Sequence, residues 1–416
     1  MNRLLTNRRF LFLLCGQAAS GLGGTFATVI MSWLVYKLTG SLIAMGSIWV
    51  AQMVPSLITQ LLSGPYLDRW DRKKVMIASE WLRATAFLLP TIAFLLESLH
   101  IWQLFLTAII IGIAEPLFRP ASMAYVAEIL PNDQLTKGNS LLEGTMQMMF
   151  LIGPALGGFI LEWAGPQAVL FLLVGTMSGA GFILLFLPQK EGGRFKHKDT
   201  WWTEFKAGLQ FYRINPALLA VGLLLMLANF TSGAASPMYL PFITEIIGGS
   251  PFQYGLFTSA LSFGMIIASI ATGVMKETKN RRPIMLGSML MIGASLAVLG
   301  FVHTFPLALI TITFMGFFII IFNINNTTLY QRKVPDELRG RVFAVRILLA
   351  QSGIPLGAFV GGILAEKWGI PVLFNVMGGL VVIVTIISFF VPIFYQLNDT
   401  SPATVPVKPR QNVKNR

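Results

Sequence analysis

Charged residues are scarce in this chain. Of its 416 residues only 12% are Asp, Glu, Lys or Arg, whereas 55% are hydrophobic and the mean hydropathy is +0.69. A soluble domain carries roughly 25% charged residues, so this sequence has too little polar surface to face water on all sides. The deficit excludes an ordinary soluble enzyme and indicates an integral membrane protein.

Cysteine and histidine are scarce as well. The single cysteine, Cys15, cannot form an internal disulfide or a multi-cysteine metal site. The three histidines, His100, His197 and His303, are isolated, and no HExxH pattern, Gly-x-Ser-x-Gly elbow or Walker loop occurs. We therefore expect no intramembrane enzyme, no bound metal, no cofactor and no direct use of ATP.

The apolar residues form long blocks of the length, about 20 residues, that a helix needs to cross a bilayer. They predict an all-α membrane protein with twelve transmembrane helices, at 10–36, 41–66, 75–96, 101–127, 139–163, 168–187, 217–243, 252–275, 283–302, 306–329, 342–364 and 372–394. The first block contains Cys15 after a basic start, but Leu14 stands where a cleavage site needs a small residue. We interpret this block as the first span and not as a removed signal.

The net charge of +13 is not spread evenly. Lys and Arg gather at both termini and in every second loop, while the opposite loops contain only Lys37 and Lys367. This is the positive-inside pattern, which predicts that both termini are cytoplasmic. The basic loops are expected to meet anionic lipid and not nucleic acid.

Two sequence patterns occur twice. Gly64, Asp68 and Arg72 recur as Gly273, Glu277 and Arg281, each 209 residues further on. A second set recurs at an offset of 204 residues: Pro131, Gly157-Gly158, Glu162 and Gly165 match Pro335, Gly361-Gly362, Glu366 and Gly369. The repeats predict two parallel six-helix bundles at 1–187 and 216–395, with a midplane site between them.

Two other segments complete the predicted organisation. The cytoplasmic loop 188–215 contains aromatic and charged residues at helical spacing over 200–213, which predicts an amphipathic helix on the membrane surface. A plain linker is the alternative. The tail 396–416 is polar and contains proline, so we expect it to be disordered.

The loop GPYLDRWDRKK at 64–74 resembles the signature of the major facilitator superfamily, with Asp71 where glycine is frequent. The TGS at 39–41, the EFKAGLQFYRINP at 204–216 and the VPDELRGR at 334–341 resemble the drug antiporter branch that includes macrolide efflux proteins. In the fifth predicted helix, Gly153, Pro154, Gly157 and Gly158 resemble the antiporter motif, with Met149 where a further glycine is usual. The resemblance covers the whole chain and implies a monomeric proton:drug antiporter.

The loop after the second helix contains a candidate clasp. Asp68 stands at a helix C-terminus, where the helix dipole disfavours a carboxylate, and the helix N-terminus near 340–342 can bind an anion. We expect the clasp to hold the outward-facing state, although a solvated loop that only sets topology is the alternative. The clasp residues are Gly64, Asp68, Arg69, Arg72 and Lys73, with Glu277 and Arg281 as the second copy.

Few charges fall inside the spans, where a charge costs about 2.5–3.5 kcal/mol. Glu115 lies near the middle of the fourth helix, and Arg119 follows one turn later on the same face. We predict that this pair couples transport to protons, with a static structural pair as the alternative. The other charges near span ends, Glu80, Arg83, Glu143 and Arg346, are expected to be interfacial or structural.

Three neutral amides, Asn229, Asn323 and Asn326, are candidates to line a substrate cavity, although hydrogen bonds between helices would explain them equally well. Together these features predict proton-coupled export of amphipathic small molecules by alternating access in a bacterial inner membrane. The alternatives are export of one metabolite, such as a siderophore, and uptake of a nutrient. The two-half repeat and the clasp argue against a channel.

Overall fold

The computed structural model describes residues 7–67, 70–188, 201–274 and 280–398. Three residues of the predicted clasp, Asp68, Arg69 and Glu277, lie outside these ranges. Within the described residues, eleven helical segments are long and apolar enough to cross a membrane.

The first half contains α2 (Arg8–Thr39), α3 (Leu42–Leu67), α4 (Arg72–Leu95), α5 (Ile101–Ile129), the 3-10 turn η1 (Asn132–Gln134) and α6 (Leu135–Leu185). Local sequence fixes several of these ends. The Asn7 side chain accepts hydrogen bonds from the Arg9 and Phe10 N–H groups and so caps α2. Gly40 ends that helix with φ +59°, a left-handed conformation that favours glycine.

The helix α6 contains two crossings. Its 51 residues exceed the length needed for one span, and Gly165 inside it has a non-helical backbone with φ 81° and ψ 171°. The repeat equivalent Gly369 has φ 85° and ψ 157° and separates α14 from α15 in the same way. With α6 divided at Gly165, the eleven candidate spans become the twelve that the sequence predicts.

The second half contains α8 (Pro216–Ala235), the short turns η2 (Ser236–Met238), α9 (Tyr239–Pro241) and η3 (Phe242–Ile246), and the helices α10 (Pro251–Val274), α11 (Arg281–Leu299), α12 (Phe305–Lys333), α13 (Asp336–Gln351), α14 (Gly353–Trp368), α15 (Ile370–Phe390) and η4 (Pro392–Leu397). The predicted helix 342–364 is interrupted at Ser352. Pro355 lacks the N–H that the Gln351 carbonyl would accept, which accounts for the interruption.

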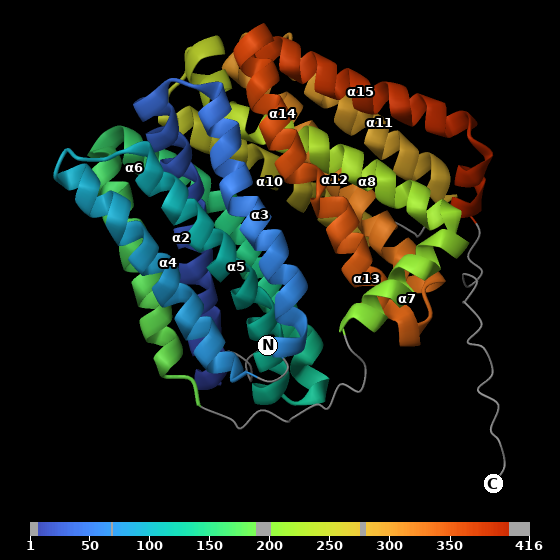
Figure 1. Ribbon diagram of the computed structural model, residues 1–416, viewed down its shortest axis with the longest axis horizontal. Helices are drawn as coiled ribbons and strands as arrows, with labels where there is room; N and C mark the ends of the chain where they lie inside the picture. The colour runs from blue at the N-terminus through green and yellow to red at the C-terminus, as the bar shows by residue number, and fades with distance from the viewer. Residues whose placement is uncertain (1–6, 68–69, 189–200, 275–279, 399–416) are drawn as a thin grey trace.

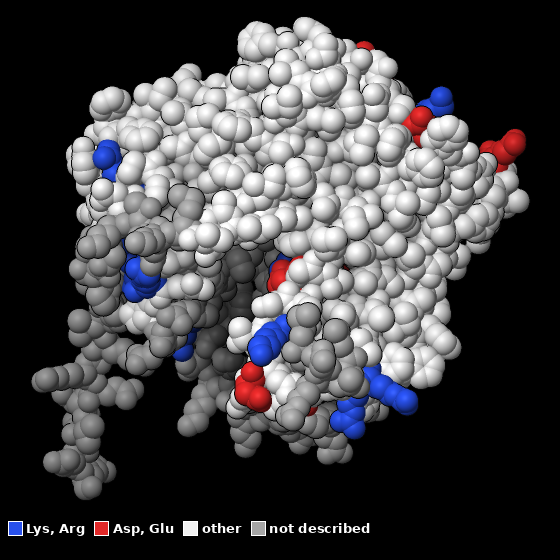
Figure 2. All heavy atoms as spheres, turned by 180° about the vertical axis from the view of Figure 1, so that it is seen from behind, with Lys and Arg blue, Asp and Glu red and all other residues white. Residues whose placement is uncertain are grey.

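The two halves lie side by side, the first from blue to green and the second from yellow to red (Figure 1). They meet through α6 against α10 and through α3 against α14. At one end of the molecule, the first turns of α3 and α10 each meet the other half. We call this end the junction end. At the opposite end, the open end, the surface is hollowed between the halves (Figure 2). A broad band of the described surface in that view lacks charged side chains, as expected for a face in contact with lipid.

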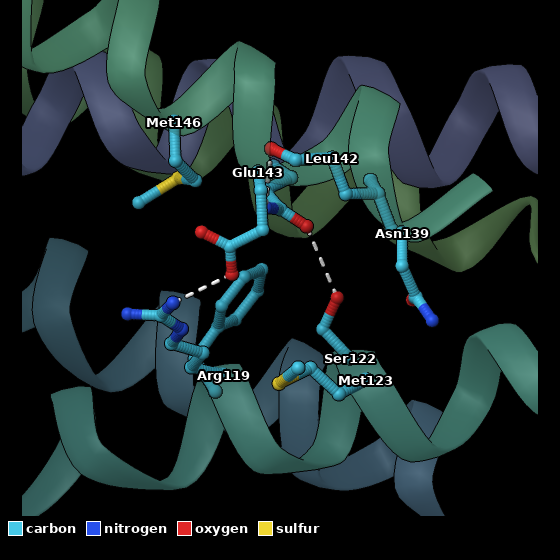
Figure 3. Close-up of a pocket in the computed structure, with 9 residues that line it drawn as sticks. Arg119, Ser122, Met123, Asn139, Leu142, Glu143 and Met146 are labelled. Carbon is cyan, nitrogen blue, oxygen red and sulfur yellow. Dashed lines mark hydrogen bonds and ion pairs between the residues drawn. The ribbon is translucent and has the colours of Figure 1, made fainter. Parts of the chain in front are cut away.

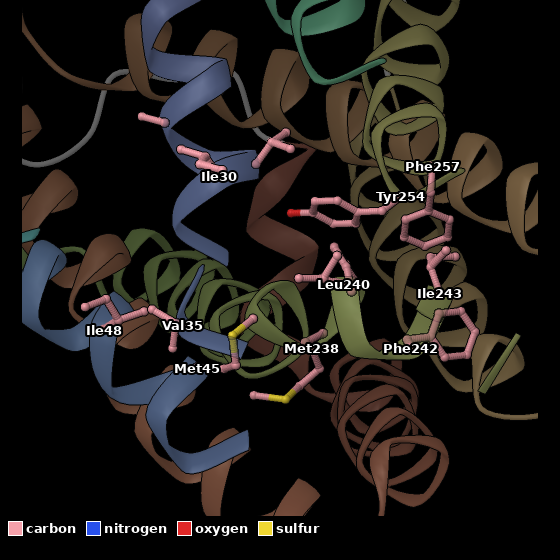
Figure 4. Packing of buried hydrophobic residues seen from close by; sticks show 14 of the residues in the cluster. Ile30, Val35, Met45, Ile48, Met238, Leu240, Phe242, Ile243, Tyr254 and Phe257 are labelled. Carbon is pink, nitrogen blue, oxygen red and sulfur yellow. The ribbon is translucent and has the colours of Figure 1, made fainter. Parts of the chain in front are cut away.

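Buried apolar side chains join the halves near the junction end. Figure 4 shows residues of α2 and α3, such as Ile30 and Met45, beside Met238 and Leu240 of the second half. On the second-half side of this cluster, the Phe242 and Phe374 rings lie 5.2 Å apart in an edge-to-face contact. Because lipid is as apolar as these side chains, close packing and not exclusion from water stabilises the contact.

The predicted helix in the central loop is present as α7 (Trp201–Ile214). It packs on α13 and α8, and a Cβ at Gly208 would lie 2.6 Å from the Arg341 carbonyl oxygen. Phe211 and Tyr212 are buried by this contact, whereas Leu209 and Ile214 stay exposed. The buried face of α7 therefore contacts protein, and its contact with a membrane surface stays a prediction.

Candidate functional site

The first half contains a polar cavity of about 170 Å³ between α2, α3, α4 and α5. Its polar lining residues are Thr28, Ser32, Gln52, Arg83 and Glu115, and Trp49 is among the others. Only two of these residues carry a charge, and they come from different helices. The cavity thus combines a cation, a carboxylate and an indole.

Arg83 belongs to a buried network on the cavity wall. Its Nη1 donates to Glu80 Oε1 at 2.8 Å and to Ser20 Oγ at 3.0 Å, and Ser20 Oγ donates to the same Glu80 oxygen at 2.8 Å. Arg83 is 4% exposed and Glu80 is fully buried. Gly24 on α2 leaves room for the guanidinium, since a Cβ there would lie 3.3 Å from Nη2. Of the two alternatives expected for these residues, interfacial or structural, the structure shows a buried structural pair, because α2 covers them.

Glu115 lies in the same cavity with its side chain exposed. Gln52 Nε2 donates to Glu115 Oε2 at 3.2 Å. The predicted ion pair with Arg119 does not form. Arg119 instead pairs with Glu143 of α6 at 2.5 Å, across a small cavity (Figure 3). Glu143 faces the guanidinium from the neighbouring helix, which gives Arg119 a better partner than a residue of its own helix.

The charges of this region therefore do not balance. Glu80 neutralises Arg83, and Glu143 neutralises Arg119. Within the described ranges, no cation lies within ion-pair distance of Glu115, although Arg83 attracts it from across the cavity. A lone carboxylate in a membrane-embedded cavity can be neutralised by a proton or by a cationic group of a ligand.

The second half has a cavity of about 100 Å³ with a neutral lining. Asn229 and Asn323 line it together with Thr231, Ser232 and Tyr239, and a role of this cavity in substrate binding stays a prediction. Asn229 Nδ2 also donates to the Ala350 carbonyl at 2.9 Å, so this amide ties α8 to α13. Asn326 is fully buried and does not line the cavity, because the following turn of α12 faces the protein interior.

The glycines of the antiporter-like motif lie at two helix contacts. Gly153 faces α2, where a Cβ would lie 2.0 Å from Thr25 Oγ1, and Gly157 faces Phe26 of the same helix. Gly158 faces α10, where a Cβ would lie 2.4 Å from the Pro251 carbonyl oxygen. Pro154 also meets α10. The motif thus joins α6 both to its own half and to the other half.

The described clasp residues make contacts within one half. Arg72 Nη1 donates to Glu128 Oε1 at 2.5 Å and to the Ala124 carbonyl at 3.2 Å. Lys73 Nζ donates to the Leu185 carbonyl at 2.8 Å. Gly64 lies near the end of α3, and Arg281 is buried at the start of α11. A contact between Asp68 and the other half stays a prediction.

Sequence reasoning did not identify Gln52, Trp49 or Arg83 as cavity residues. One signal was available for Arg83, since Glu80 and Arg83 stand three residues apart in an otherwise apolar span. Gln52 and Trp49 offered none, because a single polar or aromatic residue in a span does not show which way it faces. In the described part of the chain, no cluster of His, Cys, Asp and Glu could hold a metal.

The two halves, their twelve crossings and the cavities define a transporter of the major facilitator superfamily. Residues 4–415 match the family described as transmembrane secretion effector. The chain belongs to this family, whose superfamily consists of transporters that use ion gradients and not of enzymes.

Several individual proteins are similar over nearly the whole chain. Macrolide efflux protein A of Streptococcus pyogenes is 23% identical over 386 residues, which cover 91% of this chain and 95% of that protein. The multidrug efflux pump Tap of Mycolicibacterium fortuitum is 24% identical over 403 residues, which cover 94% and 97%.

Solved structures share the fold. The nucleoside transporter NupG matches with a TM-score of 0.73 and 14% identity, covering 96% of this chain and all of that chain. A bacterial homologue of the iron transporter ferroportin in an inward-facing state matches with a TM-score of 0.74 and 16% identity, covering 94% and 99%. At these identities the likeness concerns the fold alone.

The two Arg–Glu pairs predict different effects on stability. Arg83→Gln leaves Glu80 buried without its cation, which should cost about 3–5 kcal/mol. Arg119→Gln breaks a pair whose side chains are 65% and 42% exposed, so the cost should be about 0–1 kcal/mol. Thermal unfolding of both purified variants in detergent measures the difference. Equal shifts of Tm for the two variants would contradict the buried network.

Proposed function

We propose that this transporter exports amphipathic small molecules in exchange for protons, by alternating access between its two halves. The names of two relatives, a macrolide efflux protein and a multidrug efflux pump, support export of such molecules. The observation that carries the proposal is the lone carboxylate of Glu115 in the polar cavity.

The exchange follows from competition for one carboxylate. When Glu115 is ionised, its charge attracts a cationic group of the substrate, while Gln52 donates a hydrogen bond to one carboxylate oxygen. When Glu115 takes a proton, that attraction is lost and the substrate leaves. Because either ligand neutralises the charge, the occupied transporter can change conformation without carrying an unbalanced carboxylate through the bilayer.

The structure corresponds to the inward-facing state in this proposal. The open end is the end at which α2, α4 and α7 begin, and basic residues such as Arg8, Arg72 and Lys206 lie there. From the positive-inside rule we infer that this end faces the cytoplasm. Substrate would enter the cavity from the cytoplasm or the inner leaflet and leave at the junction end.

The topology can be tested with single cysteines in a Cys15→Ser background. Ser98→Cys lies in the loop after α4, and Ser140→Cys lies near the start of α6. A membrane-impermeant maleimide added to intact cells should label the first and not the second, which should react only after permeabilisation. The reverse pattern would place the open end outside the cytoplasm and overturn the proposed direction.

Glu115→Gln tests the coupling. In energised inverted vesicles, the variant should lose uphill accumulation of macrolides or dyes, because its neutral amide cannot exchange a proton for substrate. Substrate counterflow without a proton gradient should persist, since it needs only alternating access. Glu97→Gln, a change of another exposed acid outside the cavity, serves as the control.

Two outcomes of this assay count against the proposal. If Glu115→Gln accumulates substrate uphill as the wild type does, the coupling site lies elsewhere. If only a siderophore among the tested compounds is transported, or if transport runs inward, the alternatives of a dedicated exporter or a nutrient permease replace multidrug export.

The predicted clasp, which contains Asp68, is expected to stabilise the outward-facing conformation. Asp68→Asn should reduce transport to near background while expression and substrate binding stay close to wild type, because the carboxylate would no longer stabilise the outward-facing state. Transport and binding assays on the same vesicles separate these effects. Normal transport by the variant would show that the loop only sets the topology of the chain.

A further inference from the structure

The junction end is built from one contact that occurs twice. In the first copy, the first turn of α3 meets α14, and in the second, the first turn of α10 meets α6. Ser41, which precedes α3, and Gly46 of α3 correspond to Ser250, which precedes α10, and Gly255 of α10, 209 residues further on. On the receiving helices, Glu162 and Glu366 correspond to each other at the offset of 204 residues.

In the first copy, a carboxylate of one half caps a helix of the other. Glu366 Oε2 accepts hydrogen bonds from the Leu42 N–H at 2.8 Å and the Ile43 N–H at 3.4 Å. Ser41 Oγ accepts the Ala44 N–H at 3.2 Å. The first turn of a helix has N–H groups without intrahelical partners, and here the second half supplies the acceptor for two of them.

The second copy repeats this arrangement. Glu162 Oε2 accepts the Phe252 N–H at 3.1 Å, and Ser250 Oγ accepts the Gln253 N–H at 3.3 Å. Pro251 at the start of the helix has no N–H. The N–H groups of Phe252 and Gln253 in the first turn of α10 therefore both have acceptors. The carboxylate among these acceptors, Glu162, belongs to the first half.

Glycine makes this approach possible in both copies. A Cβ at Gly46 would lie 2.2 Å from the Ala358 carbonyl oxygen, and a Cβ at Gly255 would lie 2.2 Å from the Pro154 carbonyl oxygen. Any larger residue would push the helices apart and move the carboxylates out of hydrogen-bonding range. A third contact between the halves joins Tyr36 and Glu245, which occupy equivalent positions of the repeat. The Tyr36 hydroxyl donates a hydrogen bond to the Glu245 carboxylate.

These carboxylates act on the helix as well as on single N–H groups. The N-terminus of a helix carries a partial positive charge, which a carboxylate stabilises. When the halves separate at the junction end, both interactions are replaced by contacts with water. The closed junction therefore gains stability from two helix caps that the open junction lacks.

We propose that Glu162 and Glu366 are positioning residues that hold the junction end closed, each by capping a helix of the opposite half. Both caps must be released before the cavity can open at this end. The two caps belong to the transport cycle whatever the substrate or coupling ion is, so the inference does not depend on the proposed function.

The distance between the halves at the junction end tests this inference. Spin labels at Ser98→Cys and His303→Cys, in a Cys15→Ser background, report that distance by double electron–electron resonance, because both exposed positions lie at this end in different halves. Glu162→Gln and Glu366→Gln should each raise the ratio of open to closed junction about fivefold. The double variant should raise it about 25-fold, since the caps are separate sites of one opening step.

Two further variants make the test specific. Glu143→Gln removes a carboxylate from the same helix as Glu162, but its partner Arg119 is in its own half, so the distance distribution should not change. Glu366→Asp keeps the charge on a shorter side chain and should shift the ratio less than Glu366→Gln. Size-exclusion profiles and Tm values close to wild type establish that each variant is folded. A double variant with the same distance distribution as Glu143→Gln would overturn the inference.

Discussion

A charge inside a membrane must be neutralised, and this constraint explains how the first half is arranged. Arg83 and Glu80 are buried together, with Ser20 completing their hydrogen bonds. Arg119 and Glu143 neutralise each other between α5 and α6. Both pairs leave Glu115 without a cation at ion-pair distance among the described residues, and we propose that a proton or a cationic substrate balances its charge.

The internal repeat determines how the two halves contact each other at the junction end. The same glycine approach and the same carboxylate cap occur at both contacts of the junction end. Motion of one half relative to the other therefore breaks two equivalent contacts at once. The neutral cavity of the second half has no counterpart of Glu115 among its described lining residues, so the repeat is symmetric in its contacts and asymmetric in its charges.

Much of the fold could be predicted from the sequence. The twelve spans, the break at Gly165 between two of them and the two-half repeat all follow from runs of apolar residues and recurring positions. The rotation of each helix about its axis was harder to predict, because lipid and protein interior are both apolar and give a weak amphipathic signal. For this reason Arg119 was assigned the wrong partner, the choice between the interface and the interior stayed open for Arg83, and Asn326 was named as a candidate for the cavity.

The site was predictable in part. Glu115 stood out because a carboxylate in the middle of a span is rare. Its partner Gln52 lies on a different helix, and that contact depends on how α3 packs against α5. Glu162 and Glu366 were visible as repeated residues, but their role depends on pairing between the halves, which no single segment reveals.

If substrate and proton compete for Glu115, substrate binding should release a proton, and this release can be measured. A compound that the vesicle assay identifies as a substrate would be titrated into purified transporter in a weakly buffered solution with a pH indicator. At a pH low enough for the free transporter to hold the exchanged proton, the wild type should release up to one proton per bound molecule, and Glu115→Gln should bind the compound without releasing one. Equal proton release by the wild type and by Glu115→Gln would show that substrate and proton do not compete for this carboxylate.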